Sequence, residues 1–178
     1  MNPRFFYEFF KHPLELGAIF ESGPILIKAV CDEIHGKRIL ELGAGRGPIT
    51  KGILKNLPED GKLISLEINP YLYSHLEEIK DNRFTPLLAD ATDLEELAIE
   101  NHFDCIISGL PLSNMDYSSI DKILGFSSLR DRFIQYKYKS SDHILNHYFN
   151  SVKSKNIWLN LPPAVVYTCS NIDMDILS

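Results

Sequence analysis

Three glycines at alternate positions mark the stretch of this 178-residue chain where chemistry is expected: Gly43, Gly45 and Gly47. They follow a short apolar run and precede a helical pattern that begins at Pro48. Glycine tolerates positive φ and lets a ligand approach the backbone, and the N-terminus of the following helix presents unpaired N–H groups. A turn that only connects a strand to a helix needs one glycine rather than three. The segment therefore predicts a ligand-binding turn.

Three acidic side chains stand at the ends of successive expected strands: Glu41, Glu67 and Asp90. The ends of adjacent strands in a doubly wound sheet line one crevice, so these carboxylates predict a site. Glu67 lies about 20 residues beyond the glycines, where a carboxylate can accept both hydroxyls of a ribose. The sequence therefore predicts a nucleoside ligand.

The identity of the nucleoside depends on the glycine spacing. A dinucleotide turn follows the pattern G-x-G-x-x-G, and Pro48 stands where its last glycine would be. NAD would suit Glu67 but needs that turn. A nucleoside with a positively charged thioether tail would instead need a carboxylate near the turn, as Glu41 supplies, and a polar group at an adenine, as Asp90 supplies.

Strands and helices alternate along most of the chain, which predicts one α/β domain with a parallel sheet covered on both faces. After the strand that ends at Glu41, strands are expected at 62–68, 84–89, 103–108, 132–138, 156–160 and 164–169. Helices are expected at 24–34, 48–57, 71–80, 94–100, 120–126 and 144–152. The expected boundaries are an N-terminal helix with its connector over 1–21 and the ligand-binding domain over 22–178.

Composition and charge exclude several other classes. The formal charge of −6 and the pI near 5.5 lack the basic excess that supports binding to phosphate backbones, which disfavours nucleic acid without excluding a local basic patch. The scattered cysteines Cys31, Cys105 and Cys169 suit reduced, buried thiols in a cytoplasmic protein. No apolar stretch approaches the roughly 20 residues that span a bilayer. Glu8 and Lys11 interrupt the apolar run that a signal peptide would need.

The N-terminal segment carries a large apolar load. A helix over 3–11 would place four phenylalanines on one arc: Phe5, Phe6, Phe9 and Phe10. Such a face can lie in a membrane interface, or it can dock on its own domain as a lid. Both interpretations stay open from the residues alone.

Four segments in register resemble the motifs of class I S-adenosylmethionine-dependent methyltransferases: 39–50, 66–70, 88–92 and 105–112. The resemblance implies S-adenosylmethionine as cofactor, S-adenosylhomocysteine as product, and a Rossmann-like, mostly parallel seven-stranded sheet that ends in an antiparallel hairpin. By this likeness the glycines approach the methionine part, Glu67 holds the ribose, and Asp90 with the Ala91 backbone reads the adenine. The residues assigned to the cofactor are Glu41, Gly43, Ala44, Gly45, Gly47, Glu67, Ile68, Asp90, Ala91 and Ser108.

A narrower resemblance concerns the methyl acceptor. Segments 13–19, 108–112, 135–138 and 160–164, together with Ser22 and Pro24, look like the bacterial phosphatidylethanolamine N-methyltransferases. That family works at the membrane surface and converts phosphatidylethanolamine toward phosphatidylcholine, so the resemblance implies a phospholipid amine as acceptor. It also gives the N-terminal phenylalanines a membrane-binding purpose on the inner face of the membrane. The chain departs from the family at Glu21, which replaces a proline, and at Asp131–Arg132, which replace a Gly-Gly turn.

The segment 109–112, here called the acceptor loop, distinguishes a lipid amine from a nucleobase as the methyl acceptor. The rRNA adenine dimethyltransferases have an Asn-x-Pro-aromatic loop where this chain has Gly109, Leu110, Pro111 and Leu112. In that family the asparagine holds the exocyclic amine and the aromatic ring stacks on the flipped base, and Gly109 and Leu112 can do neither. The loop favours a small aliphatic amine. The alternatives are an rRNA adenine N6-methyltransferase and a non-catalytic nucleoside-binding or membrane-scaffolding protein.

The expected reaction is in-line attack of a neutral amine on the methyl group of the sulfonium, with alignment and exclusion of water as the main contributions. Tyr138, Tyr117 and Asp116 are candidates to orient the amine or accept its proton, in no firm order. His143 and His147 stand four apart on an expected helix without a third ligand, so no metal site is predicted. The oligomeric state is not indicated.

Overall fold

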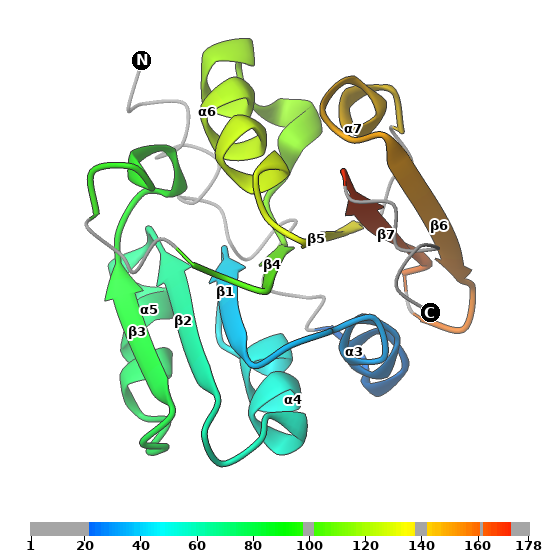
Figure 1. Ribbon diagram of the computed structural model, residues 1–178. Helices are drawn as coiled ribbons and strands as arrows, with labels where there is room; N and C mark the ends of the chain where they lie inside the picture. Colours follow the sequence, from blue (N-terminus) through cyan, green and yellow to red (C-terminus); the bar gives the residue numbers. More distant parts are fainter. Residues whose placement is uncertain (1–21, 98–101, 138–141, 161, 172–178) are drawn as a thin grey trace.

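A single sheet of seven strands forms the centre of the computed structural model, which describes residues 22–97, 102–137, 142–160 and 162–171 (Figure 1). The strand order is β3-β2-β1-β4-β5-β7-β6. The strands are β1 (Arg38–Leu42), β2 (Lys62–Glu67), β3 (Phe84–Leu88), β4 (Cys105–Ser108), β5 (Arg132–Lys137), β6 (Ser151–Ile157) and β7 (Ala164–Ser170). The five strands from β3 to β5 in this order are parallel, whereas β7 is antiparallel to both β5 and β6.

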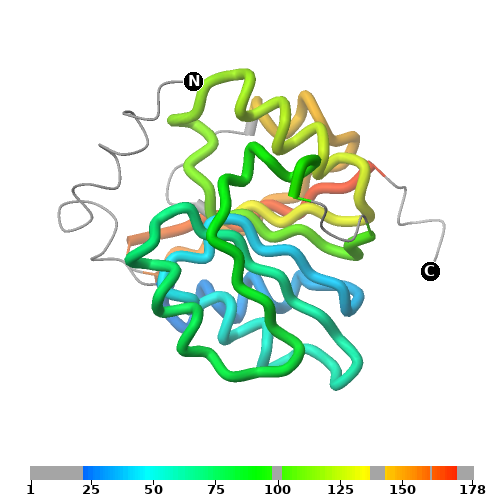
Figure 2. The backbone as a smooth tube through the Cα atoms, turned by 90° about the vertical axis from the view of Figure 1, so that its left-hand side faces the viewer, coloured from blue at the N-terminus to red at the C-terminus, as the bar shows by residue number. Residues whose placement is uncertain are grey.

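Helices cover both faces of this sheet. They are α3 (Pro24–Cys31), α4 (Pro48–Asn56), α5 (Pro70–Glu77), α6 (Tyr117–Ser128) and α7 (Asp142–Tyr148), with short 3-10 turns at Ala91–Asp93 and Leu112–Asn114. Figure 2 shows the sheet as a middle layer, with α6 and α7 above it and α3 and α4 below. The predicted doubly wound sheet with an antiparallel C-terminal hairpin is confirmed.

Alternation along the strands divides the core into two apolar clusters. In β1, Ile39 belongs to the cluster on the α3, α4 and α5 side, whereas Leu40 and Leu42 belong to the cluster on the α6 and α7 side. Every β1 residue after Arg38 is buried. A strand that is buried on both faces sits at the centre of the sheet, and the turn that follows it emerges where the strand order reverses.

Three predicted elements differ from the structure: the helix expected at 94–100, the end of the helix expected at 144–152 and the bounds of the strand expected at 156–160. The described part of the expected helix 94–100 forms turns, because Asp90 caps a 3-10 turn over Ala91–Asp93 instead. The expected helix 144–152 ends at Tyr148, and the strand expected at 156–160 runs over Ser151–Ile157. Val152 packs on the same cluster as Phe149, so its spacing imitates a continuing helix although it belongs to an edge strand.

The N-terminal segment lies outside the described residues. The predicted helix over 3–11, its four phenylalanines and the connector to residue 21 therefore stay predictions, as does the boundary between 1–21 and 22–178. Within the described ranges, no helix is both long and apolar enough to cross a lipid bilayer.

Candidate active site

The glycine turn folds over the end of β2. All three glycines have positive φ, 73° at Gly43, 60° at Gly45 and 82° at Gly47, as the sequence predicts. The N–H groups of Gly43 and Ala44 both donate to the Leu66 carbonyl, at 2.9 and 3.1 Å. These bonds hold the turn against the neighbouring strand.

The three glycines serve different purposes. A Cβ at Gly43 would lie 2.9 Å from Leu110 Cδ2, and a Cβ at Gly47 would lie 2.9 Å from Leu76 Cδ2. Among the described residues, and apart from the two chain neighbours of Gly45, no atom lies within 4 Å of the corresponding point at Gly45. Gly43 and Gly47 therefore allow close packing within the protein, whereas Gly45 borders the open space that a ligand needs.

Glu67 is fixed beside this opening. Its Oε2 accepts a hydrogen bond from the Gly45 N–H at 2.8 Å, and its Oε1 accepts one from the Asn69 N–H at 2.9 Å. The side chain is nearly buried, and burial raises its pKa above the ordinary value while these N–H groups oppose the rise. Each carboxylate oxygen has a further lone pair, so the group can still accept two hydroxyl hydrogen bonds.

Glu41 lies beneath the turn and is fully buried. Its Oε2 accepts hydrogen bonds from Thr50 Oγ1 at 2.7 Å and from Ser65 Oγ at 2.6 Å. Its Oε1 has no hydrogen-bond partner among the described residues. Burial raises the pKa of this carboxyl to about 7. A buried oxygen without a partner is what a positively charged or hydrogen-bonding ligand group would satisfy.

The end of β3 lies next to Glu67. Leu88 pairs with Glu67 across the parallel ladder, and the Ala89 N–H donates to the Glu67 carbonyl at 3.1 Å. Asp90 follows, and its Oδ1 accepts from the Thr92 N–H at 2.8 Å. Ala91 is buried in this turn.

The acceptor loop closes the other side of the glycine turn. The Gly109 N–H donates to the Leu42 carbonyl at 2.9 Å, and Ser108 Oγ accepts from the Leu110 N–H at 3.2 Å. Gln135 Nε2 donates to the Leu110 carbonyl at 3.1 Å. Ser108 and Leu112 are buried, and Leu110 packs beside Gly43.

The structure therefore brings the predicted residues from the ends of β1 to β4 together at one edge of the sheet. The open point at Gly45, the unpartnered Glu41 Oε1 and the free lone pairs of Glu67 fit a nucleoside with a charged tail. The cofactor role of each side chain stays a prediction, including that of Ile68, which lies half-buried directly after Glu67.

The three candidates for the amine fall in different places. Asp116 caps α6, where its oxygens accept from the Ser119 N–H at 3.0 Å and from Ser119 Oγ at 2.9 Å. These hydrogen bonds lower the pKa of Asp116, which makes it a weak base. Tyr117 is 90% exposed. Tyr138 lies outside the described residues, so none of the three is shown to meet the glycine turn.

Several residues at this edge were not singled out from the sequence. Thr50 and Ser65 bind the Glu41 carboxylate, and Gln135 ties the acceptor loop to β5. The Gln135–Tyr136 segment entered only as part of a family resemblance. The two residues follow the apolar Phe133 and Ile134 of an expected strand, and this was the one sequence signal that could have placed them at the site.

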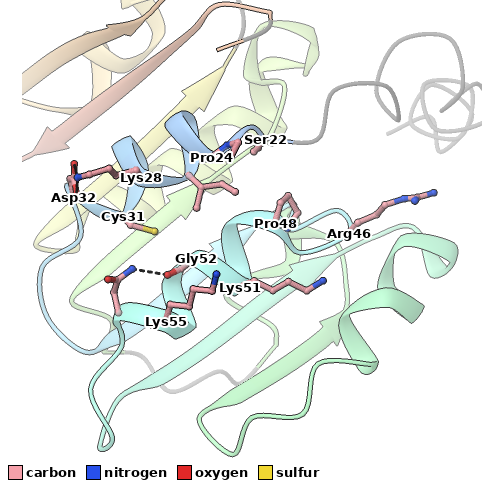
Figure 3. A pocket seen from close by; sticks show the side chains of 12 residues that line it. Ser22, Pro24, Lys28, Cys31, Asp32, Arg46, Pro48, Lys51, Gly52 and Lys55 are labelled. Atoms are coloured by element: carbon pink, nitrogen blue, oxygen red, sulfur yellow. Dashed lines mark hydrogen bonds and ion pairs between the residues drawn. The ribbon is translucent and has the colours of Figure 1, made fainter. Parts of the chain in front are cut away.

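A separate groove of about 770 Å³ lies between α3 and α4 (Figure 3). Its basic side chains are Lys28, Arg46, Lys51 and Lys55. Arg46 Nη2 donates to the Tyr71 hydroxyl at 3.2 Å, and its guanidinium carbon lies 5.7 Å from the centre of that ring. The basic lining contrasts with the carboxylates at the glycine turn, so this groove does not suit a cationic sulfonium.

In the parts of the chain that the structure describes, no three His, Cys, Asp or Glu side chains gather as a metal site. His143 and His147 both lie on α7, and His147 packs edge-on against Tyr148 with ring centres 5.1 Å apart.

Two solved structures with a similar fold are methyltransferases. Human methyltransferase-like protein 13 in complex with SAH has a TM-score of 0.61 and 14% identity, with 83% of this chain and 76% of that chain covered. The N-methyltransferase NodS of Bradyrhizobium japonicum has a TM-score of 0.61 and 10% identity, with 80% and 90% covered. These likenesses establish the fold.

Sequence comparison points the same way. The ornithine lipid N-methyltransferase of Singulisphaera acidiphila is 27% identical over 94% of this chain and 95% of its own length. The chain is a class I S-adenosylmethionine-dependent methyltransferase. No family model matches the sequence. For this methyltransferase, the cofactor is S-adenosylmethionine, and its expected place is the edge built by the glycine turn and Glu67.

Proposed function

We propose that this methyltransferase transfers methyl groups to the primary amine of a membrane lipid, with the head group of phosphatidylethanolamine as the acceptor. The observation that carries the proposal is the likeness to an ornithine lipid N-methyltransferase along nearly the whole chain. Both lipids present an aliphatic amine, and the resemblance of the acceptor loop to phosphatidylethanolamine N-methyltransferases favours the phospholipid.

The acceptor loop supports an aliphatic amine over a nucleobase. Gly109 has no side chain to bind the edge of a base, and Leu112 is buried and cannot stack on one. The overall charge of −6 also disfavours RNA, although the basic groove between α3 and α4 keeps an RNA substrate as an outcome to be tested.

The chain's own residues align the reactants in this proposal. Bound S-adenosylmethionine supplies a methyl group on a sulfonium whose leaving group is a neutral thioether. Glu67 accepts the ribose hydroxyls, Asp90 and Ala91 border the adenine, and Gly45 leaves room for the tail near Glu41. The Gly109–Leu112 loop then faces the acceptor amine and helps to exclude water.

Membrane contact is part of the same proposal. A lipid acceptor requires the protein to reach a bilayer surface, and the phenylalanines at positions 5, 6, 9 and 10 are the proposed contact. The protein would then be cytoplasmic and peripheral on the inner face of the membrane. Serine at all four positions should reduce binding to liposomes; unchanged binding with a lower melting temperature would instead indicate a lid.

Radiolabelled S-adenosylmethionine tests the acceptor directly. The protein is incubated with vesicles of phosphatidylethanolamine, with vesicles of ornithine lipid, with phosphatidylcholine vesicles as a control that has no transferable N–H, and with undermethylated ribosomal RNA. We expect label in phosphatidylethanolamine. Label only in ornithine lipid would correct the head group, label only in RNA would overturn the lipid proposal, and cofactor binding without any label would indicate a non-catalytic protein.

A further inference from the structure

Tyr136 fills the space that a side chain at Gly109 would occupy. A Cβ built at Gly109 would lie 2.7 Å from Tyr136 Cζ and closer still to the Tyr136 hydroxyl oxygen. The same point lies 3.2 Å from the Gly43 carbonyl oxygen. The phenol oxygen therefore stands between the acceptor loop and the glycine turn, where the two halves of the expected site meet.

The sheet fixes this position from both sides. Ser108 pairs with Gln135 across the parallel ladder of β4 and β5, so the following residues, Gly109 and Tyr136, emerge side by side. On its other side Tyr136 pairs with Val166 of β7. The half-buried ring packs against the cluster on the α3 and α4 side. A phenol held by two neighbouring strands is directed more firmly than a side chain on a loop.

Gln135 couples this strand to the acceptor loop. The side chain is fully buried, and its Nε2 donates to the carbonyl oxygens of Leu110 and Tyr136, each at 3.1 Å. The acceptor loop and the Tyr136 backbone therefore share one anchor. A displacement of the loop would also displace the phenol.

We propose that the Tyr136 hydroxyl orients the acceptor amine, an inference that rests on the proposed function. In the rRNA adenine dimethyltransferases a loop asparagine holds the amine. Here the loop position is Gly109, and a phenol from the adjacent strand stands in its place. A phenol oxygen can accept a hydrogen bond from an amine N–H, which turns the nitrogen lone pair away from the hydroxyl. Gly109 is then required because any Cβ would displace the hydroxyl.

The proton balance needs no base on Tyr136. The amine nitrogen forms a bond to the methyl carbon while the carbon–sulfur bond breaks with its electron pair on sulfur. The methylated ammonium then loses its extra proton to water. Tyr136 keeps its own proton and acts through alignment of the nitrogen.

Acceptors that differ in N–H content test this role. Tyr136→Phe is assayed with vesicles of phosphatidylethanolamine, its N-monomethyl derivative and its N,N-dimethyl derivative. We expect kcat to fall about tenfold with the first two, the effect of one lost hydrogen bond, and to change less than about twofold with the third, because a neutral tertiary amine has no N–H. Calorimetric affinity for S-adenosylhomocysteine should stay unchanged.

A matched control removes a hydroxyl elsewhere. Tyr148 on α7 donates its hydroxyl to Asp121 Oδ1 at 3.1 Å, so Tyr148→Phe makes the same chemical change away from the glycine turn and should leave all three rates unchanged. An equal loss on all three lipids, or weaker binding of S-adenosylhomocysteine by Tyr136→Phe, would overturn the proposal and leave the lipid function standing. A wild-type protein that methylates none of the lipids would overturn both.

Melting temperatures test whether the Tyr136 phenol occupies the space at Gly109. Gly109→Ala should lower the melting temperature because its Cβ meets the phenol. The same substitution in a Tyr136→Ala background should lower it less, because the obstructing ring is gone. Equal losses in the two backgrounds would show that the phenol does not occupy this space, and would overturn the proposal without any activity measurement.

Discussion

The two sides of the glycine turn are built in different ways. On the cofactor side, backbone N–H groups of Gly45 and Asn69 hold the Glu67 carboxylate, and the open point at Gly45 lies beside it. On the acceptor side, the Tyr136 side chain reaches across from the neighbouring strand into a space that Gly109 leaves empty. In the proposed roles, backbone groups position the cofactor side, whereas a single side chain selects the acceptor.

This contrast predicts different responses to substitution. Changes on the cofactor side should alter cofactor affinity or the pH dependence of folding. Changes on the acceptor side should alter turnover with particular amines while cofactor affinity stays constant, as the Tyr136 experiment requires.

The largest expected effect is the pH dependence that Glu41 imposes on stability. Its pKa is about 7 in the folded protein and near 4.3 in an unfolded chain. As pH rises from about 4 to about 8, the unfolded state releases this proton before the folded state does, so the folded protein loses stability, by up to about 4 kcal/mol, and the loss is complete by about pH 8.

Urea unfolding between pH 5 and pH 7 measures this slope. Glu41→Gln should flatten it, since glutamine does not titrate. Some slope should remain because burial also raises the pKa of Glu67. An identical slope in wild type and Glu41→Gln would contradict the placement of a protonatable carboxyl beneath the turn.

The next effect concerns cofactor affinity. Glu67→Ala removes both acceptors for the ribose hydroxyls and frees the Gly45 N–H, so affinity for S-adenosylhomocysteine should fall by roughly 30- to 100-fold. Isothermal titration calorimetry measures the change. Glu78→Ala, which changes an exposed carboxylate just after α5, serves as the control and should bind normally. Unaltered affinity in Glu67→Ala would contradict the placement of the ribose hydroxyls at Glu67.

Two alanine substitutions in the turn should separate ligand space from packing. Gly45→Ala and Gly47→Ala both introduce a side chain at positive φ, at a cost of about 1–2 kcal/mol. Gly47→Ala also meets Leu76 and Ile79, so it should lower the free energy of unfolding more. Gly45→Ala should weaken cofactor binding more than it weakens folding. Calorimetry measures cofactor binding and urea unfolding measures stability in both variants. The opposite order of effects would contradict the assignment of Gly45 to ligand space.

The smallest effect is expected at Asp116. Loss of the α6 cap in Asp116→Ala should cost about 1 kcal/mol of stability, whereas asparagine can still accept the cap hydrogen bond and should cost little. Because the pKa of Asp116 is lowered, Asp116→Asn should also keep its rate of methyl transfer. A large rate loss in Asp116→Asn with normal stability would restore Asp116 as the proton acceptor.

Much of the cofactor side was predictable because its determinants are local. The conformation of Gly43, Gly45 and Gly47 follows from the lack of a Cβ, and the ends of parallel strands must meet at one edge. The alternation of strands and helices predicted the sheet. The prediction was wrong at Ser151–Ile157, an edge strand. Its few apolar residues continue the helical spacing of the apolar residues in α7.

The residues alone determined the doubly wound fold, the glycine turn and the carboxylates at successive strand ends, because each depends on backbone preference and strand order. Tertiary structure decided that Glu41 lies beneath the turn against Thr50 and Ser65, that only Gly45 of the three borders open space, and that the Tyr136 phenol stands at Gly109. The Glu41 contacts depend on how β1 lies against α4 and β2, and the Tyr136 contact depends on how β4 and β5 align, rather than on any local pattern.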